Sequence, residues 1–256
     1  MSGASASPVK PQIVVRPLQT IEEMRTAVDL QRRVWGYSES DVVPDQMFIV
    51  ARESGGQVLA AYDGETAVGF ALAFAGIHGG KPYFHSHMVG VVREYQDRGV
   101  GRLLKLAQRD DAIARGIDLI EWTFDPLQLK NAHFNLAKLG AIVQRYIPNV
   151  YGRTSSPLHA GLPTDRLVAE WWLKSPHVQN VLGGKRYTAT NRSVRISIPS
   201  TIRQICAEEP ARAESIQSEV REQFTTQIAA GRAAMGFEFA EDLGSYILEP
   251  YEDRID

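Results

Sequence analysis

Apolar positions recur along the first half of the chain at spacings that predict strands and helices in turn. Residues 13–18 form a short apolar run typical of a strand, and residues 20–36 carry apolar side chains at helical spacing. Thr20 and Glu23 fit a capping box at the start of that helix, and Gly36 ends the pattern. We therefore expect a strand followed by an amphipathic helix.

Two apolar runs on either side of Asp63 and Gly64 predict a hairpin over residues 57–78, because an Asp-Gly pair is typical of a tight turn between strands. The elements expected after it are a strand over 83–92, a helix over 99–116, a strand over 117–124, a short helix over 131–140 and a strand over 141–147. Strands and helices in this order predict a mixed α/β sheet.

The pattern changes after residue 152. Residues 152–165 are rich in turn-forming residues and predict a loop. The elements expected beyond it are strands over 166–173 and 186–199, an amphipathic helix over 211–231 and a hairpin over 237–250. The pattern is compatible both with a small second domain and with an extension packed on the first sheet.

The composition is that of an ordinary globular protein with a sizeable core. The chain has 256 residues, of which 44% are hydrophobic and 23% are charged. Its net charge of −2 gives no general attraction to nucleic acid or to anionic membranes. No stretch reaches the roughly 18 apolar residues of a membrane span. We therefore expect neither nucleic-acid nor membrane partners.

The cysteine content and the N-terminus indicate the compartment. Cys206 is the single cysteine, so an internal disulfide cannot form, and the chain suits a reducing cytosol. Residues 1–11 are small and polar and lack the apolar core of a signal peptide, which predicts a disordered lead. We expect a cytoplasmic protein.

A glycine-rich turn joins the expected strand 83–92 to the helix that follows it. The first N–H groups of a helix lack internal partners and favour phosphate, and Gly99 and Gly101 would let the backbone approach it closely. Arg98 and Arg102 add positive charge. The dinucleotide-binding pattern is absent, since Leu104 stands where its third glycine would be, and so is the P-loop ending. A plain strand-to-helix turn remains the alternative.

The stretch Q-D-R-G-V-G at 96–101 resembles the Q/R-x-x-G-x-G/A motif of the GNAT acyltransferase superfamily, in which this loop holds the pyrophosphate of coenzyme A. The segment N-A-H-F-N-L-A-K-L-G-A at 131–141 is similar to another family motif, whose asparagine faces the pantetheine. The resemblance implies a mostly antiparallel GNAT sheet flanked by helices. The cofactor-binding residues that it implies are Val89, Gly90, Val91, Gln96, Asp97, Arg98, Gly99, Val100, Gly101, Arg102 and Asn131.

The resemblance also implies an organisation and a reaction. It covers an acyl-CoA-binding domain at residues 12–152, and residues 153–256 resemble the α+β extension of a bacterial group of GNAT-like proteins. The implied reaction moves an acyl group to the amine of a small molecule such as an amino acid. Acetyl-CoA is the default acyl donor and succinyl-CoA is the alternative. The implied reaction needs no metal. Whether the protein forms a homodimer is left open.

His85 and His87 are the candidate catalytic residues. Amine acylation requires a neutral amine, and a base with a pKa of about 6.5 can accept the proton at neutral pH. The two histidines lie two apart on the expected strand, so their side chains share one face. In the resembled family, one member carries a His-x-His pair here, and others carry a glutamate base at the place of His85. A metal pair and ordinary polar residues on a half-buried strand are the alternatives.

The general acid is not evident. Leu136 stands where many members of the resembled family have a tyrosine that protonates the departing thiolate. The alternatives are protonation by Tyr146 or Tyr151, or departure of the thiolate without an acid. Cys206 is distant in sequence from the motif, which favours a buried apolar role over that of a nucleophile. The pair Trp171 and Trp172 suits packing, with an aromatic substrate wall as the alternative.

Three arginines follow the core, namely Arg145, Arg153 and Arg166. One of them could anchor a carboxylate of the acceptor or of succinyl-CoA. The alternative is that they are solvated or pair with nearby acidic residues. Residues 35–47 and the chain after Tyr151 are expected to surround the acceptor. The alternative function is a CoA-binding sensor without catalysis. A nucleic-acid-binding adaptor is disfavoured by the net charge of −2.

Overall fold

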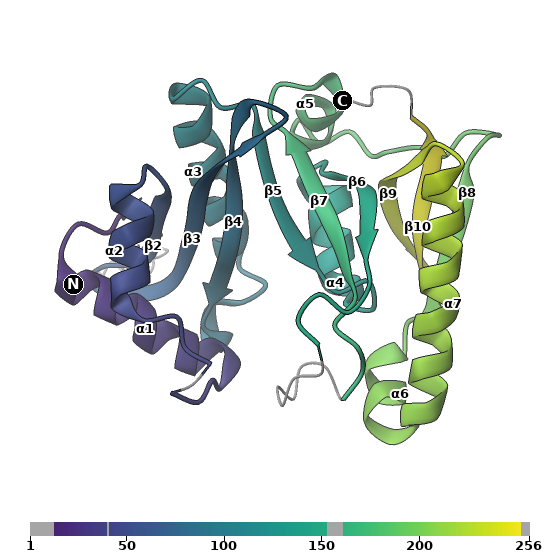
Figure 1. The fold of residues 1–256 in the computed structure, drawn as a ribbon, viewed down its shortest axis with the longest axis horizontal. Helices are drawn as coiled ribbons and strands as arrows, with labels where there is room; N and C mark the ends of the chain where they lie inside the picture. The colour runs from purple at the N-terminus through teal and green to yellow at the C-terminus, as the bar shows by residue number, and fades with distance from the viewer. Residues whose placement is uncertain (1–12, 40, 153–160, 252–256) are drawn as a thin grey trace, which may run out of the picture. The chain divides into compact units, whose positions relative to one another are not determined.

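The computed structural model describes residues 13–39, 41–152 and 161–251. The expected disordered lead, Arg153 and most of the loop expected at 152–165 therefore lie outside the described residues. The chain forms two compact units. The first comprises the chain up to Ala75 together with Ser86–Asp111, and the second comprises Gly76–His85 together with the chain from Ala112 onward. Figure 1 labels their elements.

The first unit contains four neighbouring strands in the order β1-β2-β3-β4. The pairs β1–β2 and β2–β3 are antiparallel. Its elements are β1 (Val14–Pro17), α1 (Ile21–Trp35), α2 (Asp45–Glu53), β2 (Gln57–Asp63), β3 (Thr66–His78) up to Ala75, β4 (Lys81–Val91) from Ser86, η1 (Arg93–Tyr95) and α3 (Val100–Ala114) up to Asp111.

The sequence signals at the start of this unit are confirmed. Thr20 accepts a hydrogen bond from the Glu23 amide at the start of α1, and the Glu23 carboxylate accepts one from the Thr20 amide. Gly36 ends the helix with a φ of 67°. The hairpin turns at Gly64, whose φ is 58°.

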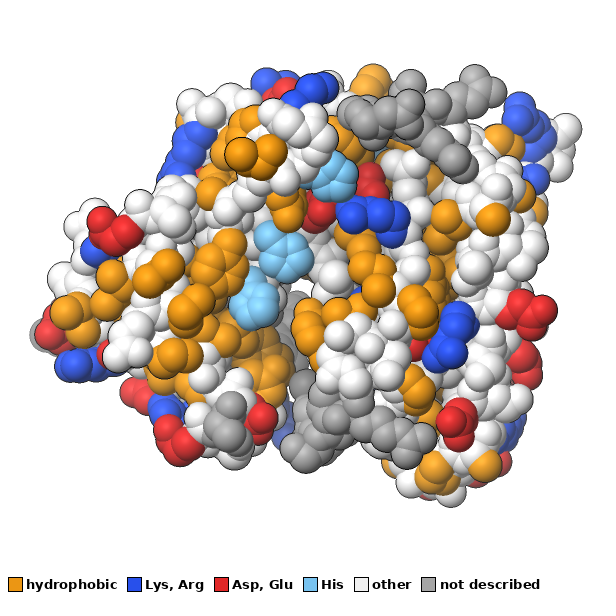
Figure 2. Space-filling model, viewed as in Figure 1, with side chains coloured by type: hydrophobic (Ala, Val, Ile, Leu, Met, Phe, Trp, Pro, Cys, Tyr) orange, Lys and Arg blue, Asp and Glu red, His pale blue; other side chains and the backbone are white. Residues whose placement is uncertain are grey.

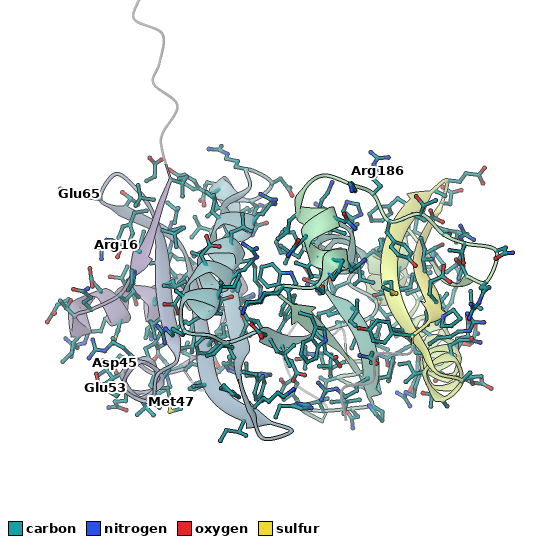
Figure 3. All side chains as sticks on the ribbon, turned by 90° about the horizontal axis from the view of Figure 1, so that it is seen from above. Arg16, Asp45, Met47, Glu53, Glu65 and Arg186 are labelled. Atoms are coloured by element: carbon teal, nitrogen blue, oxygen red, sulfur yellow. The ribbon has the colours of Figure 1, made fainter. Side chains whose placement is uncertain are left out.

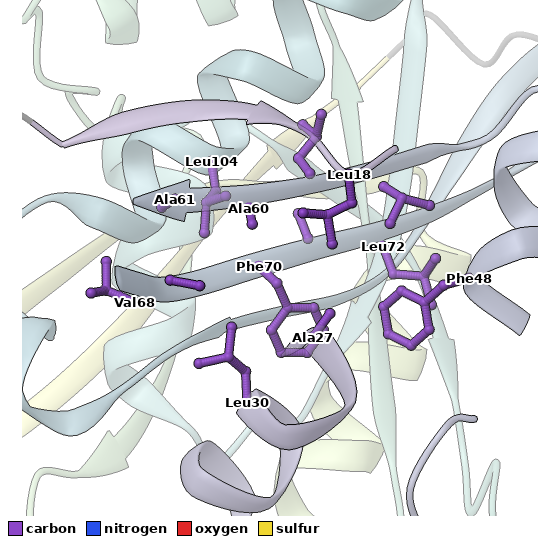
Figure 4. Close-up of a cluster of buried hydrophobic side chains, with 14 of the residues drawn as sticks. Leu18, Ala27, Leu30, Phe48, Ala60, Ala61, Val68, Phe70, Leu72 and Leu104 are labelled. Atoms are coloured by element: carbon purple, nitrogen blue, oxygen red, sulfur yellow. The ribbon is translucent and has the colours of Figure 1, made fainter. Parts of the chain in front are cut away.

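One hydrophobic core joins the helices α1 and α2 to the sheet of the first unit (Figure 4). Met24, Leu30 and Phe48 are fully buried on the helices, and Phe70 and Leu72 are fully buried on β3. The outer side of α2 carries exposed side chains such as Met47 and Glu53 (Figure 3). This core fixes β3 and therefore the strand β4 beside it.

The second unit contains the strand order β4-β5-β7-β6-β9-β10-β8. The β4–β5 pair is parallel, and the other pairs with a described register are antiparallel. Its elements after α3 are β5 (Leu119–Phe124), α4 (Leu129–Ala132), the π-helix η2 (His133–Lys138), β6 (Ile142–Ile147), β7 (Arg166–Trp172), α5 (Pro176–Leu182), β8 (Val194–Pro199), α6 (Ile202–Glu208), α7 (Pro210–Ala229), β9 (Arg232–Ala240) and β10 (Leu243–Pro250).

The mixed, mostly antiparallel α/β fold is confirmed, and the chain beyond residue 152 adds strands and helices to the second unit. β7 lies between β5 and β6 and pairs with both, and α7 packs across β6, β8 and β9 (Figure 1). The boundary expected at residue 152 stays a prediction.

Two expectations differ from the structure. The strand expected over 186–199 is confined to β8, because Thr190 and Ser193 instead bind the Glu249 carboxylate and form a turn. Three short helices, α2, α5 and α6, were not expected. Within the described ranges, every helix is too short or too polar to cross a lipid bilayer.

Candidate functional site

The glycine-rich turn leads directly into α3, as expected. Gly99 has a φ of +84°, and its carbonyl accepts the hydrogen bond of the Leu103 amide, the first bond of the helix. The N–H groups of the three residues from Val100 to Arg102 therefore have no intrahelical partner and face the start of the helix. Gly101 differs from Gly99, since its φ is ordinary and an added Cβ would meet only Val91, at 3.9 Å. The turn thus requires glycine for its conformation only at position 99.

Side chains on either side hold this loop. Tyr95 donates to the Asp63 carboxylate at 2.6 Å, and the Gln96 amide nitrogen donates to the Val91 carbonyl at 3.0 Å. The Arg98 guanidinium lies over the Tyr95 ring at 5.3 Å. Asp97 adopts a left-handed conformation with a φ of 57°. The loop is therefore anchored to β4 and to the β2–β3 turn, and its exposed cation lies near the helix start.

The expected cofactor-binding strand residues Val89, Gly90 and Val91 lie at the end of β4, immediately before the loop. An added Cβ on Gly90 would lie 2.9 Å from the Phe70 ring and 3.1 Å from Trp35, so glycine is required here for packing. Trp35, expected near the acceptor, is the last residue of α1 and stacks on Tyr37. The described register between β4 and β5 covers two positions of β4, Phe84 and His85.

The two histidines lie on one face of β4. Ser86 between them accepts a hydrogen bond from Lys105 of α3 and donates one to Gln108, so it points to the helix side. Because side chains alternate along a strand, His85 and His87 face the other way. The His87 ring is 5.6 Å from the Phe74 ring, and partial burial among such neighbours lowers the pKa of His87. A neutral imidazole at pH 7 can accept a proton.

Asn131 lies in the second unit, on the exposed side of α4. The segment after it winds as a π-helix, with the Leu139 amide bonded to the Phe134 carbonyl. Leu136, which stands where the acid would be, is fully buried there. A π-helical turn frequently marks a functional segment.

The other candidates for the general acid and for a nucleophile have surroundings that do not favour these functions. Tyr146 donates to Asp165, and burial followed by this bond raises the pKa of Tyr146 strongly, which makes it a poor proton donor. Tyr151 is exposed, with the guanidinium of the buried Arg166 over its ring. Cys206 is half-buried on α6, and burial raises the pKa of its thiol, which lowers the nucleophilic thiolate fraction.

A charged cluster lies in the second unit at a cavity of about 500 Å³. Arg145 donates to Glu121 and, at 3.3 Å, to Glu170. Burial raises the pKa of Glu121, while Arg145 opposes the shift. His78 is 3.7 Å from Glu121. Figure 2 shows acidic, basic and histidine side chains gathered at one place on the molecular surface.

The two tryptophans have different surroundings. Trp171 is fully buried and donates to the Leu139 carbonyl at 2.7 Å, so its expected packing role is confirmed. Trp172 is half-buried and lines the cavity.

Sequence reasoning missed Glu121, Glu170 and Lys105. Each lies in an element predicted to be apolar on its buried side, and each is at least nine-tenths buried. An acidic residue inside the apolar runs 117–124 and 166–173 was the available signal. In the described part of the chain, no three His, Cys, Asp or Glu side chains come together in an arrangement suited to a metal ion.

Comparison with known proteins finds a family match in the first part of the chain. Residues 22–141 match the model of the acetyltransferase (GNAT) family. The ribosomal-protein-S18-alanine N-acetyltransferase of Escherichia coli matches with a TM-score of 0.52 at 14% identity, covering 64% of this chain and 96% of that one. NAA60 of Arabidopsis thaliana, solved with acetyl-CoA, matches with a TM-score of 0.52 at 12% identity, covering 63% and 99%.

A third structure, yncA of Salmonella typhimurium with acetyl-CoA, matches with a TM-score of 0.50 at 15% identity, covering 65% of this chain and 97% of that one. At such identities the structural matches show the fold alone. A search of curated proteins finds no significant match.

Proposed function

Residues 22–141 match the model of the acetyltransferase (GNAT) family, and on that premise we propose that the chain transfers an acyl group from acyl-CoA to the amine of a small molecule. Acetyl is the default acyl group and succinyl the alternative. The observation that carries this proposal is the turn at Gly99, which opens the start of α3 directly after the strand of His85 and His87.

The pyrophosphate of CoA would be held by the loop 96–102. The free N–H groups and positive dipole end of α3 favour an anion, and Arg98 and Arg102 supply countercharge. The backbone of Val89–Val91 would bind the pantetheine arm, and the family resemblance also assigns a pantetheine-binding role to Asn131. The thioester supplies an activated acyl carbon and a thiolate leaving group.

His85 is the proposed base. An amine acceptor enters as an ammonium ion, and transfer of its proton to His85 frees the nitrogen lone pair for attack on the thioester carbon. The carbon–sulfur bond then breaks and CoA leaves as the thiolate, which is stable enough to depart because a thiol pKa is about 8.5. The second proton, which the attacking nitrogen loses as the amide forms, goes to this thiolate or to solvent. His87, whose pKa is lowered by burial, would relay the proton to solvent.

The first test is CoA binding by calorimetry. Gly101→Glu places a carboxylate at the anion site without backbone strain, since the φ of Gly101 is ordinary and its surroundings are open. We expect CoA affinity to fall by about 100-fold or more, because the added carboxylate repels the phosphate and blocks its hydrogen bonds to the backbone N–H groups. Gly101→Ala is the matched control, because it adds a side chain at the same open position without a charge. Equal CoA affinity of the two variants contradicts the proposed loop.

The second test separates an enzyme from a sensor. His85→Ala should lower kcat by roughly 10²–10⁴-fold at neutral pH and leave CoA binding intact, as expected for loss of a general base. His87→Ala should cost less if His87 only relays the proton. The assay is thiol release across acyl-CoAs and amines, including amino acids of both hands. Tight CoA binding with no thiol release from any pair would favour the sensor.

A further inference from the structure

The second unit contains a cavity of about 500 Å³. Its walls come from the β3–β4 hairpin, the strands β5, β6 and β7, the end of α7 and Tyr251. Cavities that bind small molecules commonly have volumes of about 300–1,000 Å³. The cavity is therefore large enough for a small organic ligand, and the chain after residue 152 supplies part of its wall.

Aromatic and apolar side chains form much of the wall. Tyr83 comes from β4, Trp172 from the end of β7, Ile228 from α7, and Tyr251 follows β10. Tyr83 also packs edge-on against the His78 ring at a centroid distance of 5.8 Å. Aromatic faces accommodate both apolar groups and cations.

The buried charges of the cavity are predominantly negative. The side chains of Glu121 and Glu170 are 6% and 8% exposed, and Arg145, at 40%, bonds to both of them. The two carboxylates share one guanidinium where water is largely excluded, with His78 3.7 Å from Glu121, so a bound ammonium group would supply a second full countercharge. Attraction of a cation is stronger at such a place than at the open surface.

The other charges at the cavity are more exposed or have partners of their own. Asp118 pairs with Lys174 at 2.6 Å, and both side chains are 56% exposed. Arg232 is half-buried on the wall and keeps its charge, because its bond of 2.6 Å is to the neutral Arg192 carbonyl, and Lys81 is exposed. Exposed charges are screened by solvent and salt, so the two buried carboxylates dominate recognition.

The sheet register places one wall residue of the cavity beside the proposed base. His85 and Glu121 are direct partners in the parallel pair of β4 and β5, so their side chains emerge next to each other on the same face. A cation bound at Glu121 therefore lies beside the imidazole of His85.

We propose that this cavity binds a small organic cation, an ammonium group on an apolar body, and that Glu121 and Glu170 recognise its charge. The inference rests on the proposed function in one respect, that the bound amine is the acyl acceptor. Arg145 then positions the two carboxylates and is no anchor for a substrate carboxylate.

The test is calorimetry on the full chain with benzylamine, 1,4-diaminobutane, zwitterionic phenylalanine and the uncharged benzyl alcohol. We expect the two amines to bind more tightly than benzyl alcohol and phenylalanine. Glu121→Gln and Glu170→Gln should each weaken amine binding by roughly 10- to 100-fold, the loss expected for a charge-assisted contact. Glu238→Gln, which removes a carboxylate paired with Arg195 at the surface, is the matched control and should change nothing.

A second variant protects the test against misfolding. Ile228→Trp enlarges a wall residue without touching the charges, so it should abolish amine binding while thermal unfolding stays cooperative. Amine affinity unchanged by this variant and by both glutamine variants overturns the proposal. So do the absence of binding by every amine, equal binding of benzylamine and benzyl alcohol, and a preference for phenylalanine.

The outcomes also separate this inference from the proposed function. Amine binding that depends on Glu121 and Glu170, without thiol release from any acyl-CoA, contradicts the acyl transfer and leaves the cavity proposal standing. Thiol release with an amine KM unchanged in Glu121→Gln, Glu170→Gln and Ile228→Trp contradicts the cavity proposal and leaves the acyl transfer standing.

Discussion

At the scale of single residues, the unusual side chain is a buried lysine. Lys105 on α3 is 3% exposed and donates to the Ser86 hydroxyl at 2.8 Å. Burial lowers the pKa of Lys105 well below its usual value, because removing an ammonium group from water disfavours the charged form. Ser86 separates the two candidate catalytic histidines, so this lysine supports the strand that carries them.

Stability should therefore depend on pH through Lys105. In the unfolded chain the Lys105 side chain has a pKa of about 10.4, and in the folded chain its pKa is lower. At a pH between these two pKa values, unfolding therefore takes up a proton. The free energy of unfolding should rise with pH in that window, by at most about 1.4 kcal/mol per pH unit.

Urea unfolding of Lys105→Met between pH 7 and 10 measures this effect. The variant should lose the slope and be more stable than the parent at the lower end of the range. Lys138→Met, at an exposed position, is the control and should keep the parent slope. The same slope in Lys105→Met and the parent would show that the folded protein retains the Lys105 proton.

At the scale of elements, strand β7 has the largest effect on the second unit. Its six pairs with β5 run from Leu119–Trp172 to Phe124–Leu167, and its other edge pairs with β6. The sequence predicted this strand from its apolar run, and the structure places it between two strands that precede it in the chain. A central strand supplies hydrogen bonds and apolar contacts on both sides.

A chain ending after Gly152 should therefore lose the structure of the second unit. Without β7, strands β5 and β6 would each expose an unpaired edge and an apolar face. We expect hydrogen exchange at the β5 and β6 amides to become fast, while β2 and β3 in the core of the first unit retain protection. Slow exchange at β5 and β6 in the shortened chain would contradict this view.

Other elements show where local sequence is sufficient. The capping box of α1 and the Asp-Gly hairpin were predicted because their signals lie within a few residues of each other. The strand 186–199 was overestimated because Glu249, 59 residues from Thr190, binds the turn that interrupts it. A side chain so distant in sequence cannot be read from a local pattern.

At the scale of the whole molecule, the chain order and the spatial order differ. Strands β3 and β4 each contribute to both compact units, and the chain after residue 152 completes the second unit and supplies part of its cavity wall. The roles proposed for the turn at Gly99 and for the cavity follow from these units taken separately.

The sequence by itself determined most of the elements, the mixed sheet, the glycine turn before α3 and the shared face of the two histidines. Each depends on the periodicity of side chains or on backbone conformations that act over a few residues. The resemblance to the GNAT family followed from two short motifs in the right order of elements.

The tertiary structure alone decided which distant residues meet. It placed Arg145 with Glu121 and Glu170 from three different strands, and it buried Lys105 against Ser86. The physical reason is that strand pairing and packing over long sequence separations set these contacts, and no local spacing encodes them. The charge of the cavity, and with it the proposed preference for an amine, depends on this pairing.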